Sequence, residues 1–264
     1  MNIFDSHCHL NDAEFEADLP QVMTRMAENG VRGAMIVGTD EASSRRAVDL
    51  ADQYAPCWAS VGVHPHDAAG CGEAVLERIQ SLTGSAKVRA WGEIGLDFNR
   101  MHSPRSDQER WFVRQLEVAR GLELPIILHE RDSGGRLLEL IRAHDWPDRR
   151  GVVHCFSGTA SELEGYLGMG FYIGITGIVT LAARGRELRG LVPRIPADRL
   201  LVETDAPYLT PTPERKRHRR NEPAFVRTVL LKVAEMRGQN PEALAEQVWA
   251  NTCRLFRIPA AALP

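Results

Sequence analysis

Short apolar runs rich in β-branched and aromatic residues alternate along the chain with longer amphipathic segments. The apolar runs predict eight strands, at about residues 2–5, 33–37, 58–62, 88–92, 125–128, 151–154, 171–174 and 199–204. Among the segments between them, LPQVMTRMAENG has apolar residues at helical spacing before a glycine. DQERWFVRQLEVARGLELP predicts a helix capped by Asp107 and ending near Gly121, and residues 223–258 predict two closing helices, the second beginning near Pro241.

Strands that alternate with helices in this way predict a parallel sheet that closes into a TIM (β/α)8 barrel. A doubly wound open sheet has the same alternation and is the structural alternative. With 264 residues, of which 44% are hydrophobic, the chain is long enough to bury one large core. We therefore expect a single domain over residues 1–264.

Side chains that bind metals follow several of these apolar runs. His7 and His9, in FDSHCHL, come at the end of the first run, where a strand places residues i and i+2 on one face. Such a pair alone also fits a surface accident or two packed core histidines. Its companions are Glu93, His129, His154 and Asp205, each at the carboxyl end of another run. The carboxyl ends of all strands converge only in a barrel, so this pattern favours closure and predicts a metal centre.

Six ligands exceed the needs of one tetrahedral ion, so we expect two divalent ions, zinc, magnesium or manganese, that share Glu93. We expect one ion on His7, His9, Glu93 and Asp205, and the other on Glu93, His129 and His154. A water held between the ions would lose a proton to give a bridging hydroxide. Asp205 would orient this hydroxide and act as general base, with Glu93 as the second catalytic carboxylate.

Three further positions are candidates for supporting roles. Glu203 follows the eighth run two residues before Asp205, and we expect it to orient a ligand histidine. His64, in GVHPHD, is a candidate for binding a substrate phosphate or carbonyl, and a packed histidine is the alternative. Arg220 ends a basic segment, residues 215–220, that would lie at the mouth of the barrel and contact substrate phosphates. A solvated charged face is the other reading of this segment.

Composition restricts the protein class. A formal net charge of −3 and a pI near 6.3 argue against a protein that coats nucleic acid through overall basicity. No apolar stretch approaches the length of a membrane span, and MNIFDSHCH lacks the pattern of a signal peptide, so we expect no membrane contact. Five scattered cysteines fit a reducing cytoplasm, and Cys8 and Cys155 should turn away from the neighbouring ligands. We expect a monomer, since no apolar helix face is left over.

At the level of motifs, the chain resembles the TatD metal-dependent deoxyribonucleases of the amidohydrolase superfamily. The resemblance covers nearly the whole chain, through FDSHCHL, GVHPHD, GEIGLDFNR, LPIILHERD, HCFSG, YIGITG, ETDAPYL and RRNEP in that order. It implies a TIM barrel, divalent metal on the six ligands named above, and hydrolysis of phosphodiester bonds in DNA, commonly from the 3′ end of single strands.

The residues alone predict only metal-assisted hydrolysis, which a phosphodiester, ester, amide or cyclic imide would all allow. Removal of a D-amino acid from tRNA, an ester hydrolysis, is an alternative within the same fold. A metal or nucleic-acid binder without catalysis is an alternative of another class. Turnover after metal reconstitution separates both enzymes from the binder, and the choice between single-stranded DNA and aminoacyl-tRNA separates the two enzymes. Replacement of Asp205 by Asn should abolish the turnover.

Overall fold

The computed structural model describes residues 1–259 and contains one sheet of eight parallel strands in the order β1 to β8. The strands are β1 Ile3–Cys8, β2 Val31–Val37, β3 Cys57–Val61, β4 Val88–Asp97, β5 Ile126–Arg131, β6 Gly151–Val153, β7 Tyr172–Ile175 and β8 Leu200–Val202. The α-helices are α1 Leu19–Glu28, α2 Glu41–Gln53, α3 Glu73–Ser81, α4 Arg105–Gly121, α5 Arg136–Ala143, α6 Ala160–Gly168, α7 Arg186–Leu191, α8 Val226–Arg237 and α9 Pro241–Phe256.

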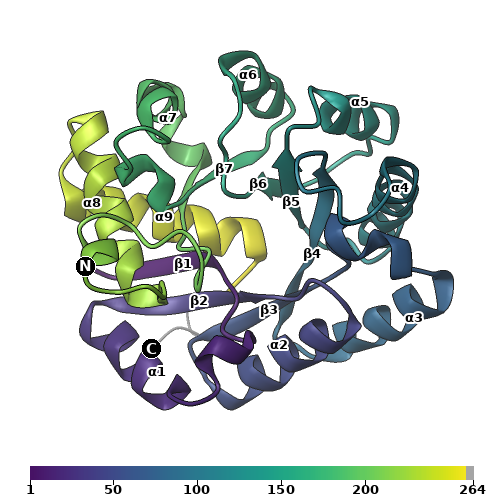
Figure 1. The fold of residues 1–264 in the computed structure, drawn as a ribbon, viewed down its shortest axis with the longest axis horizontal. Helices are drawn as coiled ribbons and strands as arrows, with labels where there is room; N and C mark the ends of the chain where they lie inside the picture. The colour runs from purple at the N-terminus through teal and green to yellow at the C-terminus, as the bar shows by residue number, and fades with distance from the viewer. Residues whose placement is uncertain (260–264) are drawn as a thin grey trace.

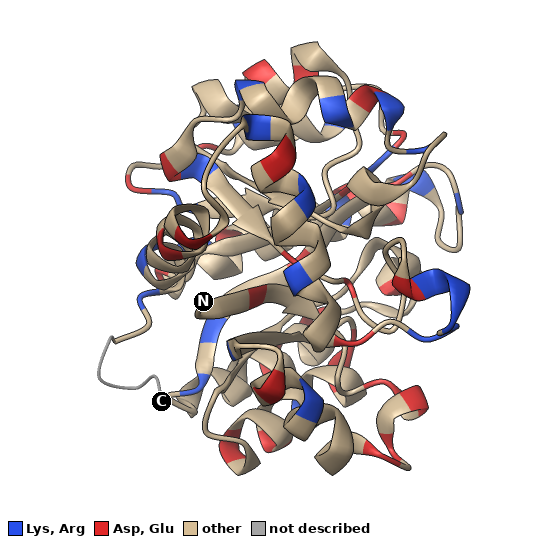
Figure 2. Cartoon of the chain, turned by 90° about the vertical axis from the view of Figure 1, so that its left-hand side faces the viewer, with Lys and Arg blue, Asp and Glu red and all other residues tan. Residues whose placement is uncertain are grey.

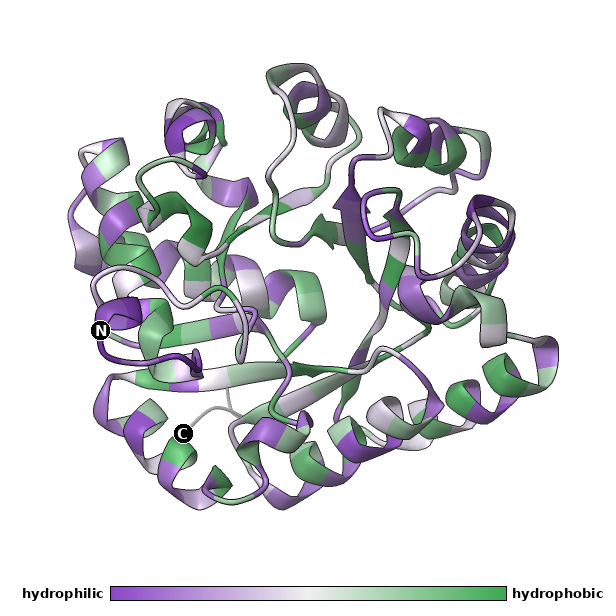
Figure 3. Cartoon of the chain, viewed as in Figure 1, coloured by the Kyte–Doolittle hydropathy of each residue, from purple (hydrophilic) through white to green (hydrophobic). Residues whose placement is uncertain are grey.

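The helices surround the strands (Figure 1), which confirms the predicted TIM barrel. Along the helices, purple and green stretches alternate (Figure 3), as expected where one face packs on the sheet and the other faces solvent. Since residues 260–264 lie outside the described part, the prediction of one domain over 1–264 stays a prediction.

The ring closes between β8 and β1 through residues that follow the end of β8. The backbone N–H of Asp205 donates to the carbonyl of His7 at 2.9 Å, and that of His9 donates to the carbonyl of Ala206 at 2.7 Å. Further into the barrel, the buried carboxylate of Asp5 accepts hydrogen bonds from the backbone N–H and hydroxyl of Thr204, at 2.8 and 2.5 Å. The closing contacts of the barrel therefore lie directly beside the predicted ligands.

One end of the barrel is filled with apolar side chains. Inward-facing residues of the strands, among them Met35, Trp58 and Ile127, pack with Leu255 and Phe256 at the end of α9. These side chains are almost completely buried. Because this end is sealed, polar chemistry is confined to the other end of the barrel, where the strands finish.

Three strands continue well beyond their predicted carboxyl ends, at the open end of the barrel. β1 continues to Cys8, beyond the predicted end at residue 5, so His7 lies within it. β4 continues to Asp97, beyond the predicted end at residue 92, and β5 continues to Arg131, so Glu93 and His129 lie within strands. The two strands approach closely at Gly95, where an added Cβ would lie 1.9 Å from the carbonyl oxygen of His129. A glycine there makes the longer pairing possible.

Other boundaries are closer to prediction. α9 begins at Pro241 as expected, and α4 ends at Gly121. α4 begins at Arg105 after Pro104, so Asp107 lies inside its first turn and does not cap it, contrary to the prediction. None of the helices in residues 1–259 combines the length and apolar character that crossing a membrane requires.

Candidate metal centre

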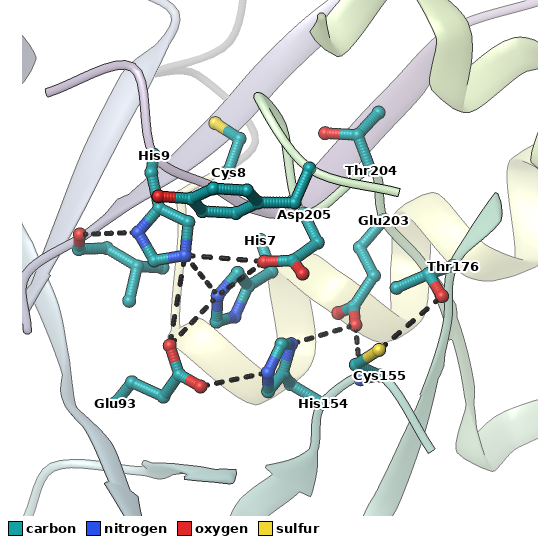
Figure 4. A network of polar contacts seen from close by, with 12 residues as sticks. His7, Cys8, His9, Glu93, His154, Cys155, Thr176, Glu203, Thr204 and Asp205 are labelled. Atoms are coloured by element: carbon teal, nitrogen blue, oxygen red, sulfur yellow. Dashed lines mark hydrogen bonds and ion pairs between the residues drawn. The ribbon is translucent and has the colours of Figure 1, made fainter. Parts of the chain in front are cut away.

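All six predicted ligands meet at the open end of the barrel. His7 lies on β1, Glu93 on β4 and His129 on β5, and the other three follow the ends of strands: His9 after β1, His154 after β6 and Asp205 after β8. The carboxylate of Glu93 points toward His7, His9 and His154 (Figure 4), which come from the ends of two different strands.

One set of ligand atoms surrounds a single point on the β1 side. The Nε2 atom of His7 lies 3.3 Å from Oε2 of Glu93 and 3.7 Å from Oδ1 of Asp205. The Nε2 atom of His9 lies 3.8 Å and 3.3 Å from the same two oxygens. Ligands placed tetrahedrally around an ion at about 2.0–2.1 Å are about 3.4 Å apart. The four residues therefore fit a divalent ion.

A second set surrounds the other oxygen of Glu93. Oε1 lies 2.7 Å from Nδ1 of His129, 2.9 Å from Nε2 of His154 and 3.4 Å from Nε2 of His64. Because its two oxygens face different histidine sets, Glu93 is suited to bridge two ions, as the sequence predicts. His154 also groups with His7 and Asp205, and its ring stacks on that of His7 at 3.8 Å. The assignment of His154 to one ion stays a prediction.

In His9 and His154, a hydrogen bond at Nδ1 favours the tautomer whose other nitrogen, Nε2, is free to bind a metal. Nδ1 of His9 faces the carbonyl of Val37 at 3.2 Å, so the ring proton belongs on Nδ1 and the Nε2 lone pair points into the site. Nδ1 of His154 similarly faces Oε1 of Glu203 at 3.2 Å. These bonds orient both rings before any ion binds.

His129 is oriented in the opposite sense. Its Nε2 atom faces Oδ2 of Asp97 at 3.4 Å, which leaves Nδ1 to bind metal beside Glu93. Asp97 was not among the predicted site residues, although its spacing could have identified it. In GEIGLD it follows Glu93 by four residues, which puts both carboxylates on one face of an extended strand. Asp97 also faces Nε2 of His66 at 2.8 Å.

His64 differs from the other histidines of the site. Its Nδ1 accepts a hydrogen bond from the backbone N–H of His66 at 3.0 Å, so the neutral ring carries its proton on Nε2. Nε2 is then a donor toward Glu93 or a substrate oxygen and has no lone pair for a metal. Burial is the main cause that lowers the pKa of His64 to about 4, so the ring is neutral near pH 7. This chemistry supports the predicted substrate contact.

Glu203 is completely buried beneath the centre. Its Oε1 faces Nδ1 of His154 and accepts a hydrogen bond from the backbone N–H of Cys155 at 2.5 Å, while Oε2 accepts one from the hydroxyl of Ser6 at 3.2 Å. Glu203 is thus placed to orient His154, and its supporting role for a metal ligand stays a prediction. Cys8 is buried as expected. Cys155 packs against the core, with its Sγ 3.6 Å from the hydroxyl of Thr176, although the residue also borders the cavity.

The carboxylates of the centre are held in the ionised form that metal binding requires. Burial by itself would raise the pKa of Glu93, but the surrounding histidines, His154 first, outweigh it and lower the pKa well below its ordinary value. Burial would likewise raise the pKa of Asp205, but the hydrogen bond with His9, together with the other histidines, outweighs burial, and the pKa is lowered. Burial lowers the pKa of His7, which favours a neutral imidazole.

A cavity of about 550 Å³ opens above these residues, a volume typical of a site for a small ligand. Cationic and aromatic side chains on its wall include Arg100, Arg131, Arg184 and Tyr208. Arg220 is not on this wall. Its guanidinium pairs with Asp18 at 2.7 Å and lines a separate cavity, so the predicted contact with substrate stays a prediction.

Known proteins resemble this chain over almost its whole length. The family described as TatD related DNase matches residues 4–257. A protein named 3′-5′ ssDNA/RNA exonuclease TatD from Pectobacterium parmentieri is 43% identical over 259 residues, which cover 97% of this chain and all of that protein. The protein of the same name from a Rahnella species is 44% identical over 263 residues, which cover 98% of this chain and 99% of the relative.

Solved structures of other proteins also resemble this chain in fold. A TatD homologue from Escherichia coli K12 superposes with a TM-score of 0.88 at 30% identity and covers 97% of this chain and 98% of its own. A TatD family hydrolase from Entamoeba histolytica has a TM-score of 0.87 at 25% identity, with coverage of 97% and 98%. The matched segment 4–257 includes all six predicted ligands, and we conclude that the chain belongs to the TatD-related DNase family.

Proposed function

We propose that this protein is a metal-dependent exonuclease that shortens single-stranded DNA, and RNA in the same way, from the 3′ end. The observation that carries the proposal is the bridging position of Glu93 between two sets of ligand atoms, at the bottom of a cavity lined by arginines. Relatives 43% identical to this chain are named 3′-5′ ssDNA/RNA exonucleases, which supports the substrate and the direction.

The residues present fit two divalent ions. His7, His9, Glu93 and Asp205 would hold one, and Glu93, His129 and His154 the other. Bound there, divalent ions activate a water molecule and neutralise charge that develops on a phosphate. Resupplying the stripped protein with zinc, magnesium or manganese shows which of these ions supports activity.

The protein side chains supply the proton transfers and the orientation. Asp205 has a side chain 14% exposed to the cavity and a lowered pKa, so it is ionised and positioned to take the proton of the attacking water. The water oxygen joins the phosphorus, and the bond from phosphorus to the 3′ oxygen of the preceding nucleotide breaks. This leaving oxygen takes a proton from solvent water, so that the shortened strand ends in a 3′ hydroxyl and a nucleotide with a 5′ phosphate is released. Nε2–H of His64 is placed to donate to a phosphate oxygen.

The cavity wall fits a nucleotide. Arg100, Arg131 and Arg184 offer guanidinium groups for phosphate, and Tyr208, which is 51% exposed, offers an aromatic face at the rim for a nucleobase. Its ring lies 6.0 Å from that of His9, so a base stacked there would be adjacent to the metal centre. Arg220, paired with Asp18, remains a proposed contact for a more distant part of the strand.

We also propose that the protein acts as a monomer in the cytoplasm. The large apolar side chains exposed among residues 1–259, Met101, Tyr208 and Leu231, are distant from each other in sequence and provide no continuous apolar helix face. The scattered cysteines of the sequence suit a reducing compartment.

The test is degradation of single-stranded DNA labelled at either end, by protein stripped with a chelator and resupplied with magnesium, manganese or zinc. We expect metal-dependent loss of nucleotides from the 3′ end by the wild-type protein and none by Asp205→Asn, with the two proteins equally folded by circular dichroism. Turnover by the Asn variant would contradict the role of Asp205. Hydrolysis of D-aminoacyl-tRNA with intact DNA would replace the nuclease proposal by the deacylase alternative.

A further inference from the structure

A second cavity adjoins the metal centre on one side. It has a volume of about 400 Å³ and lies between the loop that follows β7 and the loop that follows β8. Its lining residues are Leu181, Ala182, Ala183, Arg184, Thr212, Arg215 and Lys216. Arg184 lines both this cavity and that of the metal centre, so the two cavities border each other at this residue. We call the second cavity the 184–216 groove.

The cationic side chains of the groove are free to bind an anion. Arg184, Arg215 and Lys216 are exposed, and within residues 1–259 no carboxylate lies at ion-pair distance from any of them. Arg220 differs, because Asp18 neutralises it. On the ribbon, blue and red positions are interspersed, and the longest stretch of blue is a loop that projects at the right-hand edge (Figure 2).

The backbone that carries these side chains is fixed. The backbone N–H of Thr212 donates to the hydroxyl of Thr180 at 2.8 Å and so joins the two loops. They also touch at Gly177, where an added Cβ would lie 2.4 Å from the carbonyl oxygen of Leu209.

The first loop is further held by Arg189. Its guanidinium donates to the carbonyls of Val179, Leu181 and Ala182, at 3.2, 2.8 and 2.8 Å. A groove held in this way loses little conformational entropy when a ligand binds. In TIM barrels generally, the loops after strands 7 and 8 are a frequent place for phosphate binding.

We propose that the 184–216 groove holds the backbone of the substrate strand on the 5′ side of the scissile bond. With the 3′ end at the metal centre, the rest of the strand must leave the cavity, and at Arg184 it can do so between cationic groups. Successive phosphates then lie against Arg184, Arg215 and Lys216. This inference rests on the proposed function and adds the path of the strand to it.

Two double variants of the same loop test the path. Arg215→Gln with Lys216→Gln removes two charges from the groove, and Arg217→Gln with Arg219→Gln removes two charges that line a different cavity. The affinity for a single strand of about 12 nucleotides, with phosphorothioate linkages at its 3′ end to slow cleavage, is measured by fluorescence anisotropy over a series of salt concentrations. The KM for cleavage of an unmodified dinucleotide is measured in parallel.

We expect the groove variant to bind the strand about tenfold more weakly at low salt, and the slope of log K against log salt to fall by about 1.4, for two lost phosphate contacts. Its KM for the dinucleotide should equal that of the wild type. The control variant should also leave this KM unchanged and should lose clearly less affinity for the strand than the groove variant does. Equal weakening by both double variants would reveal attraction to the loop as a whole and overturn the groove. An unchanged groove variant, or an equal loss for the dinucleotide, would also overturn it. Wild-type protein that binds the modified strand but does not shorten the same strand without phosphorothioate linkages would refute the proposed function and leave the groove to be decided by the two variants.

Discussion

The floor of the metal centre and the 184–216 groove both carry charge, but in opposite ways. On the floor, the carboxylates of Glu93 and Asp205 are largely buried, and histidines lie within 4 Å of each. In the groove, Arg215 and Lys216 are exposed and face no carboxylate within the described residues. Buried groups that neutralise each other must all be present and correctly placed, since each loses its partner when one is removed. In contrast, each exposed charge in a groove contributes separately to the free energy of binding. Substitutions on the floor should therefore abolish function, and substitutions at the rim should weaken it by degrees.

The largest effect is expected for Glu93→Gln. An amide has one acceptor oxygen and one NH2 group, so it cannot bridge two ions as a carboxylate does. We expect the metal content per chain, measured by mass spectrometry of the elements, to fall, and turnover to fall at least about 10³-fold. Glu130→Gln is the control. Glu130 lines the same cavity, but its carboxylate accepts from the hydroxyl and backbone N–H of Ser133, at 2.6 and 2.9 Å. Wild-type metal content and turnover in Glu93→Gln would refute the bridge.

Glu203→Gln should produce a smaller loss on the same floor. The variant keeps the shape of the side chain but weakens the acceptor that orients His154 and removes the charge beneath the centre. We expect the metal affinity to fall about 10–100-fold, and excess metal to restore most of the turnover. Titration of the stripped protein with zinc gives the affinity. A loss of activity that no metal concentration restores would show that Glu203 acts other than through metal binding.

At the rim, Tyr208→Ala tests a graded contribution. Stacking of a base on an aromatic ring contributes about 1–3 kcal/mol, so the KM for single-stranded DNA should rise about tenfold while kcat changes little. Tyr208→Phe removes the hydroxyl that donates to Asp12 at 3.0 Å and keeps the ring face. If Phe and Ala raised KM equally, the hydroxyl, and not stacking, would be the important part of Tyr208.

The smallest effect concerns the paired end of the basic segment. The hydrogen bond from Arg220, with a lesser one from Arg25, lowers the pKa of Asp18 to about 2, from 3.8 for the free side chain. A lowered pKa means that this ion pair stabilises the fold above pH 3.8, and that its contribution is lost as the pH falls toward 2. We expect the free energy of unfolding in urea to differ less between the wild type and Asp18→Asn as the pH is lowered through this window. A constant difference across the window would exclude the ionised pair as its source.

The sequence predicts the six ligands because each follows an apolar run, and a barrel brings the ends of all strands together. It fails where local pattern and tertiary packing disagree. The run ending at residue 92 predicts the end of a strand, yet β4 continues, since Gly95 permits close pairing with His129. Similarly, nothing near Arg220 in the sequence identifies Asp18, 202 residues away, as its partner.

The direction of a hydrogen bond is equally hidden from the sequence. The HPH motif does not show which ring nitrogen of His64 carries the proton, but in the structure the backbone N–H of His66 donates to Nδ1 of His64 and makes Nε2 a donor. Arg184 lies in a loop with no recognisable motif around it, and only the structure shows that it lines two cavities. Such features depend on which groups meet in space.

The seam between β8 and β1 has a consequence for the synthesis of the protein. Asp5 and Thr204, which join across it, are 199 residues apart. The proposed ligands of one ion come from both sides of the seam, His7 and His9 from the first strand and Asp205 from beyond the last. During translation, the two histidines are synthesised long before Asp205, so the set of ligands stays incomplete until most of the protein has been made. Ions that bind the finished set then stabilise the closed ring by mass action. Nuclease activity is thereby tied to completion of the chain, and a truncated translation product would carry the histidines without a working centre.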